Sequence, residues 1–204
     1  MTHQTATVPS RVLPGVAFQL PDGGMTDDQF YRFCLLNPDL RIERTWDKFI
    51  VIIPPTNSET GNLNFELSTE LGIWNRRTQL GVGFDSSTGF KLPNGADRSP
   101  DLAWIRRERW DALPKEEKRR FAPIVPDFVI EIRSPDQSLT GLKDKMSEYL
   151  SNGCLLGWLI DPQQRLTWVY RPEEPERPVD FSQLFSGHPV LPGFELTMGS
   201  LWQM

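Results

Sequence analysis

The segment from Pro126 to Pro135, PDFVIEIRSP, restricts the possible folds of this chain more than any other stretch. Glu131 and Arg133 stand at its end, where a charge in a covered strand is costly unless it is paired, metal-bound or functional. Because side chains alternate along a strand, these two charges should point to the same side of the sheet. The rest of the segment has the apolar composition of a buried β-strand, in Phe128, Val129, Ile130 and Ile132.

Helical and strand patterns alternate along the remaining chain. Helices are predicted within residues 25–38, 56–77, 113–121 and 138–153, and strands within 40–55 (a hairpin), 80–95 (two short strands), 101–105 and 155–172 (a strand pair). This order predicts an α/β or α+β domain, in which a mixed central sheet is flanked by helices. We expect one domain over residues 26–204, an extended arm over 1–25, and a proline-rich tail after 172 that packs on the domain.

Composition excludes some function classes. The net charge of -5 argues against a protein that coats nucleic acid without specificity, but it permits a site-specific nucleic-acid enzyme. Cys34 and Cys154 form neither a CxxC pair nor a disulfide framework, so both are expected to be buried free thiols. We see no secretion signal and no apolar stretch near the ~20 residues that span a bilayer, and we expect a cytoplasmic protein without membrane contact.

A pair of carboxylates carries the strongest functional signal. Asp101 follows a proline at the start of a predicted strand, about thirty residues before Glu131. If the two strands are neighbours, both side chains converge on one point, and two carboxylates there favour a hard cation such as Mg²⁺. A nearby basic side chain can orient water and offset charge on a phosphate. The pattern therefore indicates metal-assisted phosphodiester hydrolysis.

The same residues carry a family resemblance. PD…EIR resembles the motif of the PD-(D/E)XK nuclease superfamily. The longer string over residues 126–172, with PPTNSETGNLN (54–64) and FDSSTGFKLPNGADRSPDLAWI (84–105), is similar to a large bacterial family of restriction endonuclease-like proteins. The resemblance spans most of the chain, from about Thr26 to Pro172.

The resemblance implies a nuclease core, a mixed sheet with helices on both faces, and a site that acts on DNA. It implies that Asp101 and Glu131 are metal ligands, with the backbone carbonyl of Ile132 as a third. Mg²⁺ is the expected cofactor and Mn²⁺ a substitute. It also implies an assisting helical carboxylate, for which Glu59 fits best and Glu66 is the fallback. A homodimer is expected, because two sites are needed to cut both strands of a duplex.

The chain departs from the superfamily motif at Arg133, where lysine is usual. Arginine is always charged, so it can clamp a phosphate but is a poor proton donor or acceptor. Either Arg133 takes the positioning role, or Lys145 reaches in from the following helix. We favour Arg133 over Lys145.

Three other interpretations stay open. The site can be degenerate, in a domain that binds nucleic acid without cutting it. The chain can instead be a protein-interaction module in which Glu131 and Arg133 form a structural ion pair. The basic run over residues 106–120 can contact DNA phosphates, although its interleaved acidic residues favour a salt-bridged surface.

Overall fold

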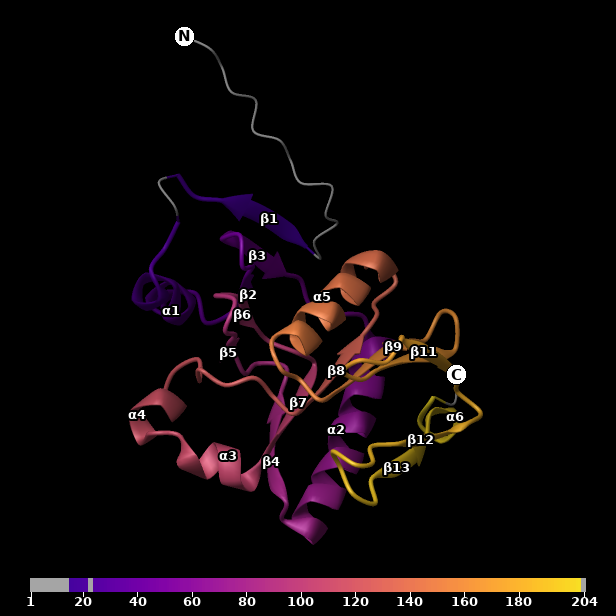
Figure 1. The fold of residues 1–204 in the computed structure, drawn as a ribbon. Coiled ribbons are helices and arrows are strands. Elements are labelled where there is room, and N and C mark those ends of the chain that lie inside the picture. The colour runs from indigo at the N-terminus through magenta and orange to yellow at the C-terminus, as the bar shows by residue number, and fades with distance from the viewer. Residues whose placement is uncertain (1–14, 22–23, 203–204) are drawn as a thin grey trace.

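A computed structural model describes residues 15–21 and 24–202 of the chain (Figure 1). The helices are α1 (Asp27–Leu36), α2 (Ser58–Thr78), α3 (Arg107–Ala112), α4 (Lys115–Lys118), α5 (Leu139–Ser151) and α6 (Met198–Leu201). The strands are β1 (Val16–Gln19), β2 (Arg41–Arg44), β3 (Phe49–Ile53), β4 (Gly81–Asp85), β5 (Phe90–Lys91), β6 (Asp97–Arg98), β7 (Leu102–Arg106), β8 (Phe128–Ile132), β9 (Leu156–Asp161), β10 (Leu166–Tyr170), β11 (Arg177–Asp180), β12 (Leu184–Ser186) and β13 (Glu195–Thr197).

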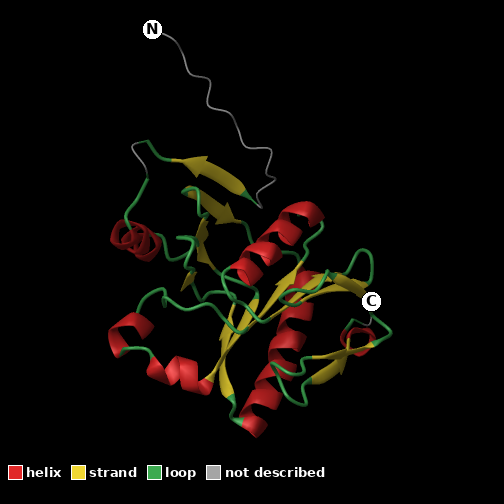
Figure 2. Ribbon diagram, in the orientation of Figure 1, coloured by secondary structure: helices red, strands yellow, loops and turns green. Residues whose placement is uncertain are grey.

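The central sheet has the strand order β11-β10-β9-β8-β7-β4. Only β8 and β9 are parallel among its strand pairs in the described chain, so the sheet is mixed, as the sequence predicts. Helices α2 and α5 cover its two faces (Figures 1 and 2). The predicted fold class, a mixed sheet flanked by helices, is confirmed.

Strand β8 is the central element, and its side chains alternate between two cores. One set packs with the apolar stripe of α2, and the other packs with α5. Every residue of β8 is buried, which explains its almost unbroken apolar sequence. The side facing α2 joins Phe128, Ile130 and Ile132 to Leu63, Leu67, Leu71 and Trp74, and the side facing α5 joins Val129 to Leu142, Met146 and Tyr149.

A second sheet has the order β1-β3-β2-β6-β5 and contains the predicted hairpin as β2 and β3. It joins the end of β2 to β6, where Arg44 is the register partner of Asp97. Arg44 is fully buried and pairs with Asp97 at 2.6 Å and with Asp27 of α1 at 2.5 Å. This contact attaches α1 to the second sheet and brings β2 close to the chain that enters β7.

The two ends of the chain extend these sheets. The arm expected over residues 1–25 lies partly outside the described residues, but Val16–Gln19 form strand β1 against β3. In the tail, Phe181, Phe185 and Phe194 lie in the same core as α2 and β8. The indole nitrogen of Trp74 also donates a hydrogen bond to the backbone carbonyl of Pro192 at 3.0 Å. The tail therefore covers α2.

The segment after β7 differs from the expectation. The charged helix predicted within residues 113–121 is confined to α4, and another short helix, α3, begins directly after β7. The rings of Phe121 and Tyr31 meet edge to face at 5.2 Å, which ties the chain after α4 to α1. No helix in the described part of the chain is long and apolar enough to cross a membrane.

Candidate active site

Asp101 lies beside the end of β8, at the point where the sequence places the site. Strands β7 and β8 are neighbours and run antiparallel, with Leu102 opposite Ile130. One carboxylate oxygen of Asp101 accepts a hydrogen bond from the backbone nitrogen of Ile132 at 2.8 Å. The other accepts one from the guanidinium of Arg41 at 2.9 Å. Asp101 is thus fixed next to the peptide that follows Glu131.

Glu131 points from β8 toward α5 and is only 3% exposed. Its Oε1 lies 2.8 Å from Nζ of Lys145, and it accepts a hydrogen bond from the hydroxyl of Tyr149 at 2.9 Å. Lys145 and Tyr149 are four residues apart in α5, so they share one face of the helix. The lysine side chain reaches the strand carboxylate because α5 packs directly on this face of the sheet.

The sequence interpretation missed Glu43, which completes the contacts of Lys145. Glu43 lies in β2, is fully buried, and has its Oε1 2.8 Å from the Lys145 nitrogen. It also accepts hydrogen bonds from Arg98 at 3.0 Å and from the backbone nitrogen of Ser99 at 2.9 Å. The sequence did contain a sign of its importance, because Glu43 is a charged residue within a strand of the predicted hairpin. Its partners could not be inferred, because they lie far away in the sequence.

Arg133 is engaged elsewhere. Its guanidinium donates to a carboxylate oxygen of Asp161 at 2.8 Å and to the backbone carbonyl of Gln137 at 3.0 Å. Asp161 ends β9, the parallel neighbour of β8, and it is fully buried. Of the two candidate basic residues, the structure places Lys145 rather than Arg133 against Glu131. This is the reverse of the preference drawn from the sequence.

The two candidate helical carboxylates lie outside the cavity that leads to Asp101. This cavity measures about 330 Å³, and α2 contributes Thr60 and Asn64 to its wall. Glu59 is exposed in the first turn of α2, and Glu66 is half-buried further along the helix. Neither of them lines the cavity, and the buried Glu131 and Lys145 are not part of its wall either. Its other walls include Asp39, Arg41, Thr56, Ser86, Asp101, Ile132, Ser134 and Gln137.

The surroundings set unequal pKa values for the two glutamates that contact Lys145. Burial is the main cause that raises the pKa of Glu131 to about 7; Lys145 and Arg41 oppose this shift, and the negative charges of Asp101 and Glu43 add to it. Burial also opposes ionisation of Glu43, but Lys145 and Arg98 outweigh it and lower the pKa to about 2. The same carboxylates raise the pKa of Lys145 although burial opposes its charge.

The donor set is compatible with a hard divalent cation. In the described part of the chain, no three His, Cys, Asp or Glu side chains are grouped to hold a metal. The protein offers two carboxylates, Asp101 and Glu131, which is the sparse oxygen set that Mg²⁺ accepts while it keeps several waters. Burial is the main cause of the raised pKa of Glu131, and a cation there would offset the negative charges of Asp101 and Glu43 that add to it.

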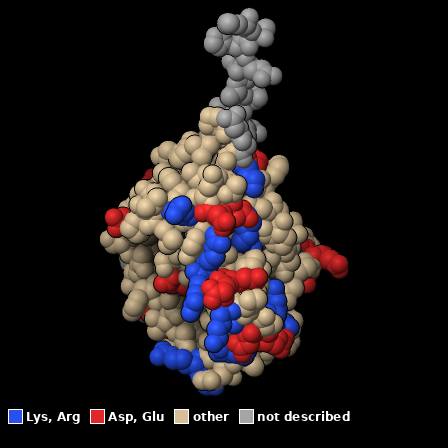
Figure 3. Space-filling model, turned by 90° about the vertical axis from the view of Figure 1, so that its left-hand side faces the viewer, with Lys and Arg blue, Asp and Glu red and all other residues tan. Residues whose placement is uncertain are grey.

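The basic run after β7 forms a paired surface. Figure 3 shows acidic and basic side chains interleaved on this side of the molecule. Arg119 pairs with Glu116 at 3.1 Å, and Arg120 pairs with Asp28 of α1. Arg109 lies 2.8 Å from the buried carboxylate of Asp127. These contacts favour the salt-bridged surface over a uniformly positive one.

The mixed sheet and its flanking helices define a restriction endonuclease-like fold, with acidic residues and a lysine gathered at the ends of central strands. The chain belongs to the Uma2 family, described as "Putative restriction endonuclease", whose model matches residues 27–199. The resemblance seen in the sequence is therefore confirmed at the level of the family.

A solved structure supports the fold. The chain is similar to a protein from Anabaena variabilis described as "a putative nuclease belonging to DUF820", with 25% identity and a TM-score of 0.72. The match covers 88% of this chain and 98% of that one. No curated protein matches the chain.

Proposed function

We propose that this protein is a metal-dependent endonuclease that hydrolyses DNA phosphodiester bonds through a site of the PD-(D/E)XK type. The observation that carries the proposal is the contact of Lys145 with Glu131, next to Asp101 at the end of β8. In this proposal Lys145, from the helix that follows β8, takes the role of the basic residue, and Arg133 pairs with Asp161 instead. The family description and the similar nuclease-like structure support the same reaction class.

In this proposal Asp101, Glu131 and the backbone carbonyl of Ile132 hold Mg²⁺, or Mn²⁺ in its place. When bound, the cation would supply an activated water and offset charge on the scissile phosphate. Lys145 stays protonated between two carboxylates, so it acts as a fixed positive charge that orients water and stabilises the developing charge. Arg41 holds Asp101 in place at the cavity wall.

The test compares two lysines of the same helix in a supercoiled plasmid nicking assay, with Mg²⁺, Mn²⁺ or EDTA. Lys145→Met removes the buried charge, whereas Lys143→Met removes a charge that pairs with Glu176 at the surface. We expect metal-dependent nicking by the wild type and by Lys143→Met, and loss of nicking in Lys145→Met and Glu131→Gln. Circular dichroism checks that each variant is folded.

The outcomes separate the remaining alternatives. Equal nicking by Lys145→Met and the wild type would refute the assigned site. DNA binding without nicking by any protein, across plasmids of different sequence, would identify a catalytically silent binding domain. Absence of both DNA binding and nicking in the wild type would favour a protein-interaction module. We also propose a homodimer with two sites, and sedimentation equilibrium measures this directly.

A further inference from the structure

A second cavity adjoins the candidate active site. It measures about 450 Å³ and lies between α1 and the start of β2. Asp39, Arg41 and Ser86 line both this cavity and the one that contains Asp101. The two hollows therefore meet at Arg41. The new part of the wall is largely apolar, with Tyr31, Cys34, Leu35, Leu40, Ile42 and Phe121.

Arg41 has hydrogen-bond donors beyond those that its protein contacts use. Its terminal nitrogens donate to Asp101 at 2.9 Å and to the backbone carbonyl of Ser99. A guanidinium has five N–H donors, so these two contacts leave others unused, and the Arg41 side chain keeps 27% exposure where it lines both cavities. Because a guanidinium matches the geometry of phosphate oxygens, this site suits a phosphodiester better than a neutral ligand.

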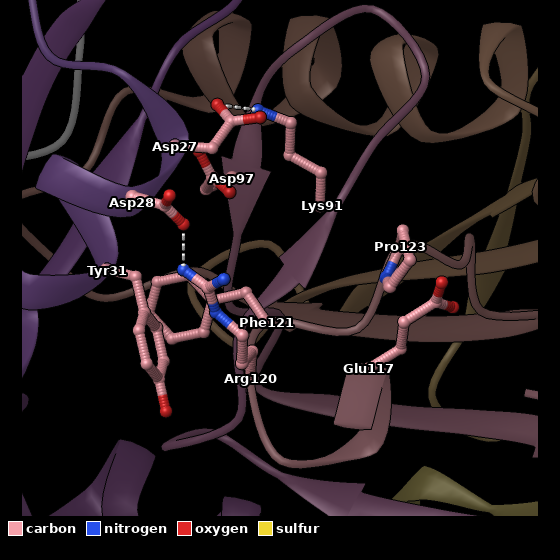
Figure 4. A pocket seen from close by; sticks show the side chains of 9 residues that line it. All are labelled: Asp27, Asp28, Tyr31, Lys91, Asp97, Glu117, Arg120, Phe121 and Pro123. Carbon is pink, nitrogen blue, oxygen red and sulfur yellow. Dashed lines mark hydrogen bonds and ion pairs between the residues drawn. The ribbon is translucent and has the colours of Figure 1, made fainter. Parts of the chain in front are cut away.

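The apolar wall suits a flat heterocycle. Leu35 is 62% exposed and Leu40 is 44% exposed at this wall, so a base seated there would remove apolar surface from water. The rings of Tyr31 and Phe121 stand at its edge. Their other side borders a smaller acidic pocket of about 190 Å³, shown in Figure 4.

The smaller pocket does not suit a nucleic acid. Its charged side chains are paired with one another, Asp27 with Lys91 and Asp28 with Arg120 (Figure 4). Its wall also carries Glu117, which adds negative charge. The larger cavity has fewer charged residues in its wall, Asp39 and Arg41, and its remaining wall supplies apolar surface for a base.

We propose that the apolar cavity is a subsite for an unpaired nucleotide next to the scissile phosphate. Arg41 contacts the phosphate, and the wall around Leu35 and Leu40 receives the base. The inference rests on the proposed function for the scissile bond, and it names the substrate class as single-stranded or locally unpaired nucleic acid. A paired base stays in its stack, and extracting it requires unstacking energy that an already unpaired base does not.

The test uses two neighbouring leucines of α1 and measures binding in EDTA, where the proposed hydrolysis does not proceed. Leu35→Glu places a carboxylate in the cavity wall, and Leu36→Glu makes the same change at a residue that is 76% exposed and does not line the cavity. The probes are a fluorescent oligothymidylate, an abasic oligomer of equal length and charge, and a fully paired duplex. Thermal unfolding checks that both variants fold like the wild type.

We expect Leu35→Glu to weaken oligothymidylate binding by about tenfold, the scale of losing one stacked base, and Leu36→Glu to change it by less than about twofold. The abasic oligomer should bind the wild type more weakly and show no difference between the two variants. The duplex should be insensitive to Leu35→Glu.

Equal effects of Leu35→Glu and Leu36→Glu on oligothymidylate, or equal wild-type affinity for the abasic oligomer, would overturn the subsite. If the wild type nicks plasmid but the binding assay gives either of these results, the proposed nuclease activity is supported and the subsite is rejected. The expected binding pattern without any nicking would support the subsite and reject the nuclease.

Discussion

Glu43 is the residue on which the buried charge cluster depends, and Glu43→Ala tests this directly. Its carboxylate contacts Lys145 at 2.8 Å and Arg98 at 3.0 Å, and all three side chains are buried. Removing one partner of a buried ion pair costs about 3–5 kcal/mol. Lys145 keeps Glu131 and Arg98 keeps Glu148 as partners, so the lower end of that range, about 3 kcal/mol, is expected.

Urea unfolding followed by circular dichroism measures this loss in the free energy of unfolding. For a chain of this size, about 3 kcal/mol corresponds to a fall in Tm of roughly 6–12 °C. The matched control is Glu116→Ala, which removes a carboxylate paired with Arg119 on the exposed surface and should leave stability unchanged. If Glu43→Ala lowers the free energy of unfolding no more than the control does, the buried charge cluster does not depend on Glu43.

The pH dependence gives an independent check on the same residue. The pKa of Glu43 is about 2 in the folded protein against 4.5 for an unperturbed glutamate. Because the folded-state pKa is the lower one, ionised Glu43 contributes stability above about pH 4.5 and loses it as the pH falls toward 2. The difference in unfolding free energy between the wild type and Glu43→Ala should therefore shrink over this interval. A difference that stays constant would contradict the lowered pKa.

Two further predictions concern Arg133 and the thiols. Arg133→Met should lower the free energy of unfolding, because it leaves the buried carboxylate of Asp161 without its ion-pair partner, but it should retain nicking activity per folded molecule. A folded Arg133→Met variant without activity would restore Arg133 to the catalytic role. Cys154 is buried as expected, but Cys34 is only half-buried. Burial raises the pKa of Cys154 to about 12 and partial burial raises that of Cys34 to about 11, so both thiols should react slowly with a disulfide reagent at pH 8. Fast reaction in native buffer would contradict these raised pKa values, and urea should release both thiols.

The sequence predicted the elements that depend on local pattern. The apolar run of β8 and the stripe of Leu63, Leu67, Leu71 and Trp74 each follow a period that a single strand or helix imposes. Asp101 lies beside β8 because β7 and β8 pair, and the proposed convergence of carboxylates required that pairing. The sequence therefore placed one strand carboxylate, Glu131, and its neighbour Asp101 at the candidate site before any contact was known.

Tertiary structure decided which charges meet there. Glu43 and Lys145 are 102 residues apart, and they meet only because β2 joins the second sheet while α5 packs on the first. Arg133 follows directly after β8, and the register of the parallel pair β8–β9 brings it to Asp161 as a partner. Local periodicity sets the direction of a side chain along its own element. Its partner depends on the packing of distant elements, so only the fold shows that Lys145, and not Arg133, contacts Glu131.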